Sequence, residues 1–373
     1  MQHQDSALYR ASFPAGFRPL IDRLAERDYG KVLGGDESTV IFRSDFPPRP
    51  APYFQALSLV VDSVEGRSLE AAYRAFAARS GGGAAAAALR RAATSPAFSG
   101  RRASRFALRS FLRGSPSPVP KDARLALERS VAAVTGLRPD SERPDLELQV
   151  SIREDGSAQF LAPARGERAD DRKRGALPRS TARLLCELSA PRGDDVFLDP
   201  FTGSGALPLE RARMGDYAMI FAGDADAACM EAFKEALKAE ERASASFSRK
   251  RRTIFPKILD ARDLSRFQPS FFTAIVTDPP WGLYEKLDEA ALLGLYADFL
   301  READRVAAEG CRLVLLVGRE APLEEALARS GAAWAIAEDY PVLVAGRKAR
   351  ALRLGKRPGE RSASRGAGVE DRR

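Results

Sequence analysis

The sequence contains a single histidine, His3, and only three cysteines among 373 residues. Ser-His-Asp and Cys-His catalysis and histidine-ligated metals all need histidines placed within a fold, and one residue near the start of the chain does not supply them. Cys186, Cys229 and Cys311 are odd in number and far apart, so neither a disulfide framework nor a zinc knuckle is indicated. We therefore predict no metal, and chemistry carried by carboxylates, backbone groups, aromatic side chains or a cofactor.

Long hydrophobic runs are also absent. No apolar stretch approaches the ~20 residues that a transmembrane helix needs. The first residues, MQHQDSALYR, lack the basic-then-apolar order of a signal peptide. With 45% hydrophobic and 29% charged residues, the composition is typical of a globular protein. These features predict a cytoplasmic protein with no membrane partner.

Positive charge is concentrated in two places, although the net formal charge is only +8. Residues 98–124 carry seven Lys and Arg against one Asp, and residues 346–373 carry ten against three Asp and Glu. Such clusters indicate a polyanionic partner such as nucleic acid. In the first cluster the candidate phosphate contacts are Arg101, Arg102, Arg105 and Arg109. The alternative is a core of phenylalanines under a solvated face of arginines.

The first 163 residues predict a small α+β region. Strands are expected at 7–13, 31–44, 54–64, 105–115 and 144–163, and helices at 17–28, 68–80 and 122–136. The alanine-rich stretch 81–95 can form a further helix. Glycine pairs and Asp-Gly steps mark turns, so we expect turns at Gly34–Gly35 and Asp155–Gly156.

After a charged linker, strands and helices alternate regularly. Strands are expected at 195–201, 217–224, 257–264, 274–280, 311–318, 334–346 and 348–355. Helices between most of them predict a doubly wound, mostly parallel sheet, and the short turn at Gly346 predicts an antiparallel edge strand. A basic insertion at 241–257 interrupts this region, and the tail after residue 355 is expected to be disordered.

The stretch DPFTGSGALPLE, residues 199–210, places glycines between a strand and a helix. A phosphate-binding P-loop needs Lys and Ser or Thr after the glycines, and both are missing. A dinucleotide fingerprint needs a third small residue where Pro208 stands, and the Asp199 carboxylate would repel a pyrophosphate. The turn is therefore expected to hold a cationic or zwitterionic ligand.

Three successive strand ends supply suitable groups for such a ligand. Asp199 can pair with an ammonium group, Asp224 can bind ribose hydroxyls, and Asp260 can accept from an adenine amino group. Together these contacts describe S-adenosylmethionine. The predicted cofactor-binding residues are Asp199, Pro200, Thr202, Gly203, Ser204, Gly205, Asp224, Asp260 and Ala261.

The motif TDPPWG follows the fourth strand and provides the predicted catalytic residues Asp278, Pro279, Pro280 and Trp281. The two prolines make a stiff, extended exit from the sheet and leave carbonyls exposed. The Asp278 carboxylate and the Pro279 carbonyl can accept the two N–H bonds of an exocyclic base amine and stabilise the positive charge that develops on it. Trp281 can stack on a base flipped out of its helix.

Taken together, these motifs resemble those of the THUMP-domain class I RNA methyltransferases, and the front region resembles that family more loosely. The resemblance implies a ferredoxin-like segment (1–55), a THUMP-like RNA-binding domain (56–163), a linker (164–176), a methyltransferase domain (177–355) and a basic tail (356–373). The family more often has Tyr or Phe at the position of Trp281.

The resemblance also implies a function: N2-methylation of a guanosine in RNA, with tRNA favoured over rRNA. Two other functions stay open. The same DPPW chemistry suits a DNA adenine-N6-methyltransferase, and a non-catalytic RNA-binding protein could retain the fold.

Overall fold

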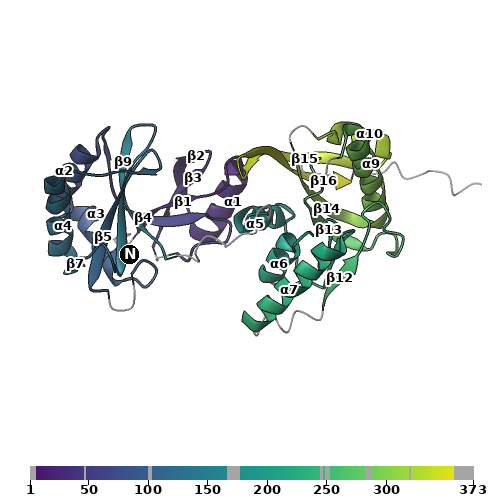
Figure 1. The fold of residues 1–373 in the computed structure, drawn as a ribbon, viewed down its shortest axis with the longest axis horizontal. Coiled ribbons are helices and arrows are strands. Elements are labelled where there is room, and N and C mark those ends of the chain that lie inside the picture. The colour runs from purple at the N-terminus through teal and green to yellow at the C-terminus, as the bar shows by residue number, and fades with distance from the viewer. Residues whose placement is uncertain are drawn as a thin grey trace, which may run out of the picture. The chain divides into compact units, whose positions relative to one another are not determined.

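The computed structural model of the chain describes residues 6–45, 48–99, 103–165, 177–243, 247, 253–282, 287–318 and 321–356. The chain divides into two compact units, residues 1–171 and 172–373 (Figure 1). Most of the predicted linker, most of the basic insertion and the tail after Lys356 lie outside the described residues. Among the described helices, none combines the length and the apolar character that membrane spanning requires.

The first unit is built on one sheet. Its described strands are β1 (Ala7–Ser12), β2 (Val32–Asp36), β3 (Thr39–Ser44), β4 (Ala56–Glu65), β5 (Arg105–Leu112), β6 (Ser115–Pro116), β7 (Arg138–Pro139), β8 (Leu146–Ile152) and β9 (Ser157–Pro163). They lie in the order β2-β3-β1-β4-β9-β8-β5-β6, and β7 pairs with β5. Because β1 and β4 pair antiparallel, with Tyr9 opposite Leu59, the sheet continues across the predicted boundary at residue 55. The division of this region into two domains stays a prediction.

One predicted turn in this sheet is confirmed and the other is wrong. Gly156 has a φ of +82° in the β8–β9 hairpin, as expected for Asp155–Gly156. Gly34 and Gly35 instead lie within β2, and the chain turns at residues 37–38. A side chain at Gly35 would place its Cβ 2.1 Å from the carbonyl oxygen of Thr39, so this glycine permits the close approach of β3.

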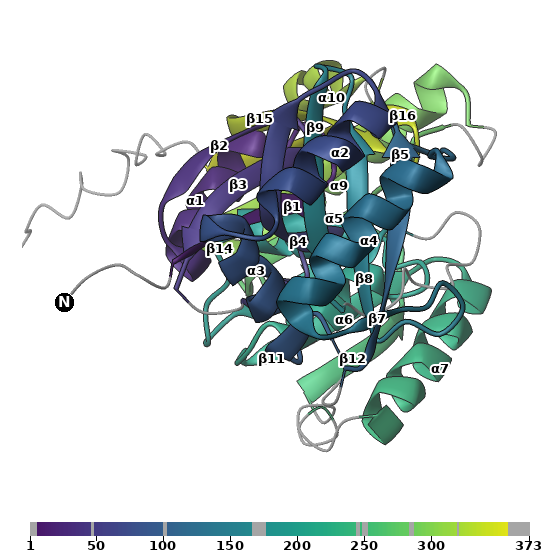
Figure 2. The same cartoon turned by 90° about the vertical axis from the view of Figure 1, so that its left-hand side faces the viewer.

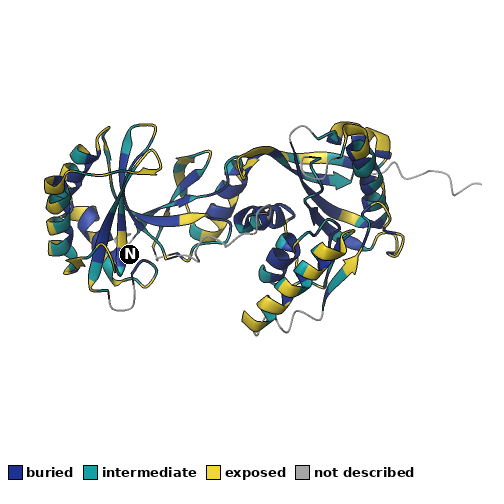
Figure 3. Cartoon of the chain, viewed as in Figure 1, coloured by how far each residue is buried: buried dark blue, intermediate teal, exposed yellow. Residues whose placement is uncertain are grey.

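Four helices of the first unit are α1 (Arg18–Tyr29), α2 (Leu69–Arg79), α3 (Gly83–Thr94) and α4 (Lys121–Thr135). The alanine-rich stretch forms α3, and α4 ends at Gly136 in a left-handed conformation with φ of +74°. Figure 2 shows α2 and α4 side by side across the strands. Their outward faces are exposed, whereas the strands beneath them are largely buried (Figure 3).

The second unit is a doubly wound sheet, as predicted. Its strands are β10 (Val196–Asp199), β11 (Met219–Asp224), β12 (Ile254–Ile258), β13 (Phe272–Thr277), β14 (Ala307–Gly318), β15 (Trp334–Val344) and β16 (Arg347–Lys356). They lie in the order β12-β11-β10-β13-β14-β16-β15. The first five are mutually parallel, and the edge strand β15 pairs antiparallel with β16, which is itself antiparallel to β14. The described helices are α5 (Arg179–Leu188), α6 (Ala206–Arg213), α7 (Ala227–Ala243), α9 (Glu289–Val306) and α10 (Leu323–Ser330).

The predicted third strand of this sheet, residues 257–264, is wrong in position. The strand is β12, Ile254–Ile258, which begins in the stretch that we assigned to the basic insertion. Ile254 is 2% exposed and lies opposite Ile220 of β11, so it contributes to the core. The chain then turns, because the carboxylates of Asp260 and Asp263 accept hydrogen bonds from N–H groups two residues further on.

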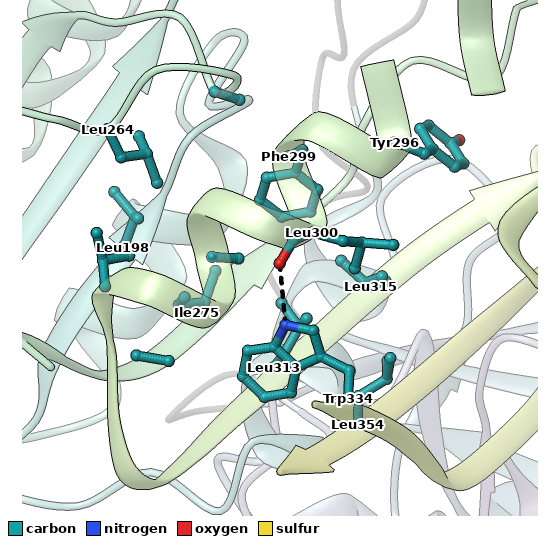
Figure 4. Packing of buried hydrophobic residues seen from close by; sticks show 14 of the residues in the cluster. Leu198, Leu264, Ile275, Tyr296, Phe299, Leu300, Leu313, Leu315, Trp334 and Leu354 are labelled. Atoms are coloured by element: carbon teal, nitrogen blue, oxygen red, sulfur yellow. Dashed lines mark hydrogen bonds between the residues drawn. The ribbon is translucent and has the colours of Figure 1, made fainter. Parts of the chain in front are cut away.

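Apolar residues of α9, β13, β14 and β16 form the core on one face of this sheet (Figure 4). Trp334 of β15 is 2% exposed and donates its indole N–H to the carbonyl of Leu300 at 3.2 Å. This hydrogen bond satisfies the only polar atom of the side chain and fixes the edge strand against α9.

A buried ionic network lies on the other face of the sheet. Asp195, fully buried before β10, accepts hydrogen bonds from Arg312 of β14 at 2.5 Å and from Arg211 of α6 at 3.2 Å. Arg312 also donates to the carbonyl of Ser189 at 2.9 Å. Burial alone would raise the pKa of Asp195, but the N–H of Arg192 and the guanidinium of Arg312 outweigh it, and the pKa is lowered. The carboxylate is therefore ionised and bonded on both oxygens.

Replacing Arg312 with Leu should destabilise the protein strongly, because it leaves the Asp195 charge buried without its closest partner. We expect the free energy of unfolding to fall by about 3–5 kcal/mol, measured by urea denaturation. Arg301→Leu is the control, since Arg301 and Asp298 form an exposed pair at 2.9 Å and should contribute less than ~1 kcal/mol. Equal losses in the two variants would contradict this role.

Candidate active site

Three acidic residues lie at the carboxyl ends of neighbouring parallel strands. Asp199 ends β10, Asp224 ends β11 and Asp278 directly follows β13. β10 pairs in parallel with both neighbours, with Asp199 opposite Ala222 and Leu198 opposite Ile275, so the three strands end at one edge of the sheet. The carboxylates of Asp224 and Asp278 are close enough to Asp199 to raise its pKa. The structure thus gathers three predicted site residues.

Asp199 is the most deeply buried of these carboxyl groups, with 1% of its surface exposed. Its Oδ1 accepts hydrogen bonds from the Thr277 hydroxyl at 2.6 Å and from the Phe201 N–H at 3.2 Å. Its Oδ2 is buried and has no hydrogen-bond partner among the described residues. Burial, together with the charges of Asp278 and Asp224, raises the pKa of Asp199 to about 8.

The glycine turn is shaped by backbone hydrogen bonds. Thr202 donates its N–H to the carbonyl of Gly223 at 2.9 Å and its hydroxyl to the carbonyl of Asp199 at 2.8 Å. Gly205 begins α6 in a left-handed conformation, with φ of +97°, and a Cβ there would lie 2.1 Å from the Phe233 ring. Within the same turn, Pro200 is buried and Ser204 is exposed.

Asp224 links this turn to the second strand. One of its oxygens accepts from the N–H of Gly203 at 2.9 Å, and the other accepts from the N–H of Asp226 at 2.9 Å. These backbone donors fix the carboxylate plane, and each oxygen retains a lone pair for a further donor. Asp224 can thus accept further hydrogen bonds from a ligand bound at the strand ends.

Asp260 and Ala261 lie beyond β12 rather than within a strand. Asp260 forms an ion pair with Arg262 at 2.7 Å, and hydrogen bonds from that guanidinium lower its pKa despite partial burial. Ala261 is 3% exposed and packs into the core. A ligand amine at Asp260 would therefore share the carboxylate with Arg262.

The DPPW segment is fixed from both sides. Trp281 donates its indole N–H to Oδ1 of Asp278 at 2.8 Å. Tyr296 of α9, 1% exposed, donates its hydroxyl to the carbonyl of Pro280 at 2.8 Å. Gly318, at the end of β14, lies against the Trp281 side chain, since a Cβ there would be 3.3 Å from the Cβ of Trp281. The Trp281 side chain therefore orients Asp278 in addition to offering a ring face.

The candidate RNA-binding arginines of the first unit have acidic neighbours. Arg105 lies 3.6 Å from both Asp140 and Asp145, and Arg109 donates to the carbonyl of Ser141 at 3.1 Å. Arg101 and Arg102 lie outside the described residues. The phosphate-binding role of these four residues stays a prediction.

Several contributors to the site were missed from the sequence. Thr277 and Tyr296 donate to the site residues, and Phe233 and Gly318 shape their surroundings. Thr277 could have been noticed as the residue immediately before Asp278. The other three lie between 15 and 45 residues from the motifs they contact, and no local pattern marks them.

The two glycines of the turn give a matched test of its geometry. Gly205→Ala should lower the melting temperature by several degrees and weaken ligand binding at the strand ends, because it combines left-handed strain with a clash against buried Phe233. Gly203→Ala is the control: its φ is +54° and a Cβ there meets no atom within 4 Å, so only about 1 kcal/mol of strain is expected. Equal effects of the two substitutions on thermal unfolding would contradict the close packing at Gly205.

Comparison with known proteins shows that the chain is similar to methyltransferases. Residues 165–347 match the family model of the RMKL-like methyltransferase domain. The chain is 35% identical over 199 residues to the tRNA (guanine(6)-N2)-methyltransferase of Thermus thermophilus, covering 52% of this chain and 56% of that protein. It is 28% identical over 198 residues to the tRNA (guanine(10)-N2)-dimethyltransferase of Methanothermobacter thermautotrophicus, covering 49% and 55% respectively. The chain therefore spans little more than half the length of these relatives in the aligned regions.

The solved structure of TrmN from Thermus thermophilus is similar over 94% of this chain and 99% of that one, with a TM-score of 0.66 and 25% sequence identity. The similarity thus extends over both units, whereas the family model covers the second. We conclude that the second unit has the class I methyltransferase fold and is similar to the RMKL-like methyltransferase domain.

Proposed function

We propose that this chain is an S-adenosylmethionine-dependent methyltransferase that forms N2-methylguanosine in tRNA. The observation that carries the proposal is the convergence of Asp199, Asp224 and Asp278 at the ends of three neighbouring strands of a class I methyltransferase sheet. The names of the two relatives support guanine N2 as the acceptor and tRNA as the substrate.

The residues at the first two strand ends fit the proposed cofactor. Asp199 has a buried oxygen without a partner among the described residues, which suits a positively charged group, and Asp224 suits ribose hydroxyls. Gly205 lets the turn pack closely against Phe233, and the surroundings of Gly203 are open, since a Cβ there meets no atom within 4 Å. S-adenosylmethionine carries an ammonium, a sulfonium and a ribose, and when bound it supplies an electrophilic methyl group. In this proposal Asp260 contacts the adenine amino group alongside Arg262.

The third strand end would hold the acceptor. A guanine amino group is a weak nucleophile because its lone pair is delocalised into the ring. Asp278 and the carbonyl of Pro279 would accept its two N–H bonds, orient the nitrogen and stabilise the charge that develops on it. Asp278 would then receive or relay the released proton. Trp281, held on Asp278 by a 2.8 Å hydrogen bond, would offer its ring to the base.

We assign RNA binding to the first unit, as a ferredoxin-like segment followed by a THUMP-like domain. Basic residues of the stretch 98–124 would contact phosphates. Arg105 and Arg109 are half-exposed and already lie beside acidic groups, so their contribution would depend on rearrangement around RNA.

The substrate can be tested with purified protein and radiolabelled S-adenosylmethionine. We expect label in tRNA transcripts, recovered as N2-methylguanosine by nucleoside mass spectrometry. Transcripts lacking the guanosine at position 6 or at position 10, the positions named for the two relatives, would locate the site. Label in rRNA or as N6-methyladenine in DNA would redirect the proposal. A lack of any transfer and of any thermal stabilisation by S-adenosylhomocysteine would overturn it in favour of a non-catalytic protein.

Replacing Asp278 with Ala should lower kcat by roughly 10³-fold, because it removes the group that orients and stabilises the acceptor nitrogen. The affinity for the cofactor should change little. Glu325→Ala is the control, since Glu325 lies in the first turn of α10 and is exposed. Methyl transfer that survives in the Asp278 variant would refute the catalytic role of this carboxylate.

Trp281→Phe separates the two roles of the indole, since phenylalanine keeps a stacking face but cannot donate to Asp278. A hydrogen bond to a charged group contributes about 1.5–3 kcal/mol, so we expect kcat to fall roughly 10- to 100-fold with KM for tRNA nearly unchanged. Trp281→Ala should raise KM as well. Steady-state kinetics that match wild type for Trp281→Phe would leave stacking as the role of this residue.

A further inference from the structure

The Asp199 carboxyl lies in surroundings that no cation compensates. Its Oδ2 is buried and has no partner among the described residues, while Oδ1 accepts only from a hydroxyl and a backbone N–H, those of Thr277 and Phe201. Within the described part of the chain, no lysine or arginine lies within ion-pair distance of it. For an ionised carboxylate placed in this way, two neutral donors offset only part of the free-energy cost of desolvation.

The charged groups on the surrounding elements favour the neutral form of Asp199. Asp224 at the end of β11 and Asp278 after β13 repel a negative charge at this position. On α5, the nearby Cys186 thiol is fully buried and its pKa is raised, so it contributes no charge. The arginines of α5 and α6 have acidic partners: Arg183 pairs with Glu187, Arg179 and Arg213 with Glu210, and Arg211 with Asp195.

Asp199 nevertheless has the geometry to hold a charge when a cation arrives. The Thr277 hydroxyl, 2.6 Å from Oδ1, and the Phe201 N–H both favour the ionised form. A positive group beside Oδ2 would supply the missing partner of that oxygen. The balance between the neutral and the ionised carboxyl is therefore set by the charge of the ligand.

We propose that Asp199 selects cationic ligands by exchanging its own proton for the positive charge of the ligand. The inference rests on the function proposed above. In the ligand-free protein Asp199 carries a proton. When the ammonium or the sulfonium of the cofactor binds beside Oδ2, the O–H bond of the carboxyl group breaks. The electron pair of that bond stays on the carboxylate, and the proton passes to solvent. A neutral ligand of the same shape leaves the proton in place.

The dependence on pH follows from the position of this equilibrium. The pKa of Asp199 is raised to about 8, so at pH 7 most ligand-free molecules hold the proton. Binding of a cation then requires its release, and the dissociation constant should fall about tenfold for each unit of pH up to about 8. Above that pH the carboxylate is already ionised. The affinity should then become independent of pH if the sulfonium is the partner, and should decrease again if the ammonium is, because an α-amino group loses its own proton at pH ~8.

Isothermal titration calorimetry of the full chain measures the released proton directly. Titrations in two buffers of different ionisation enthalpy should give close to one proton released per S-adenosylmethionine bound at pH 7. At pH 9.5 a sulfonium partner should give no net release, and an ammonium partner should give proton uptake, because the free α-amino group is then largely neutral. S-adenosylhomocysteine keeps the ammonium but lacks the sulfonium, and 5′-methylthioadenosine lacks both. Release with the first two ligands identifies the ammonium, release with S-adenosylmethionine alone identifies the sulfonium, and equal release with all three contradicts the proposal.

Two variants tie the proton to this residue. Asp199→Asn should bind S-adenosylmethionine more weakly and release no proton. Thr277→Val removes a donor that favours the ionised carboxylate, so proton release should persist to higher pH than in wild type. Identical binding enthalpies in both buffers for wild type at pH 7 would overturn the proposal. The proposed function fails separately, if wild type binds no S-adenosylmethionine at any pH.

If Asp199→Asn binds no S-adenosylmethionine, thermal unfolding without ligand still tests whether the proton belongs to Asp199. The folded-state pKa of Asp199 is raised, so its contribution to stability is present at low pH and is lost as the pH rises towards about 8. The melting temperature of wild type should therefore fall more steeply between pH 6 and 8 than that of Asp199→Asn. Parallel profiles would contradict the assignment of the proton to Asp199.

Discussion

Burial of an acidic side chain beside two others at adjacent strand ends is the constraint on which the site of the second unit depends. Three parallel strands deliver Asp199, Asp224 and Asp278 to one edge of the sheet, and the first is buried beside the other two. An ionised Asp199 would be costly in the ligand-free fold, because no cation in the described part of the chain lies beside it, and in our proposal the carboxyl therefore holds a proton. A cationic ligand would supply the missing partner of Oδ2, so the surroundings that disfavour an unpaired negative charge favour the binding of a cation.

The scaffold around this edge holds the site residues in place by hydrogen bonds that leave the carboxylate oxygens further lone pairs for a ligand. Backbone N–H groups orient Asp224, and Tyr296 holds the carbonyl of Pro280 while Trp281 holds Asp278. On the opposite side of β10, the buried network of Asp195 ties β10 to β14 and α6. The strands that carry the site therefore have little freedom to move apart, and the preorganised geometry suits catalysis by orientation.

Much of this arrangement can be predicted from the sequence, because its determinants are local. The glycine turn, the strand ending in Asp224 and the DPPW segment are contiguous motifs, and the alternation of strands and helices fixes their common edge. The position of β12 was predicted wrongly, since its apolar start, Ile254, follows a basic stretch that resembled a loop. The hydrogen bonds of Thr277 and Tyr296, and the protonation of Asp199, depend on contacts between distant segments, which no local pattern encodes.

The central claim is spatial: a methyl donor bound between Asp199 and Asp224 faces Asp278. A crystal structure of the chain with S-adenosylmethionine tests it most directly. The account predicts the ribose hydroxyls on Asp224, a positive group of the amino-acid portion or the sulfonium beside Oδ2 of Asp199, and the methyl directed towards Asp278. A cofactor bound at another edge of the sheet, or a methyl directed away from Asp278, would contradict it.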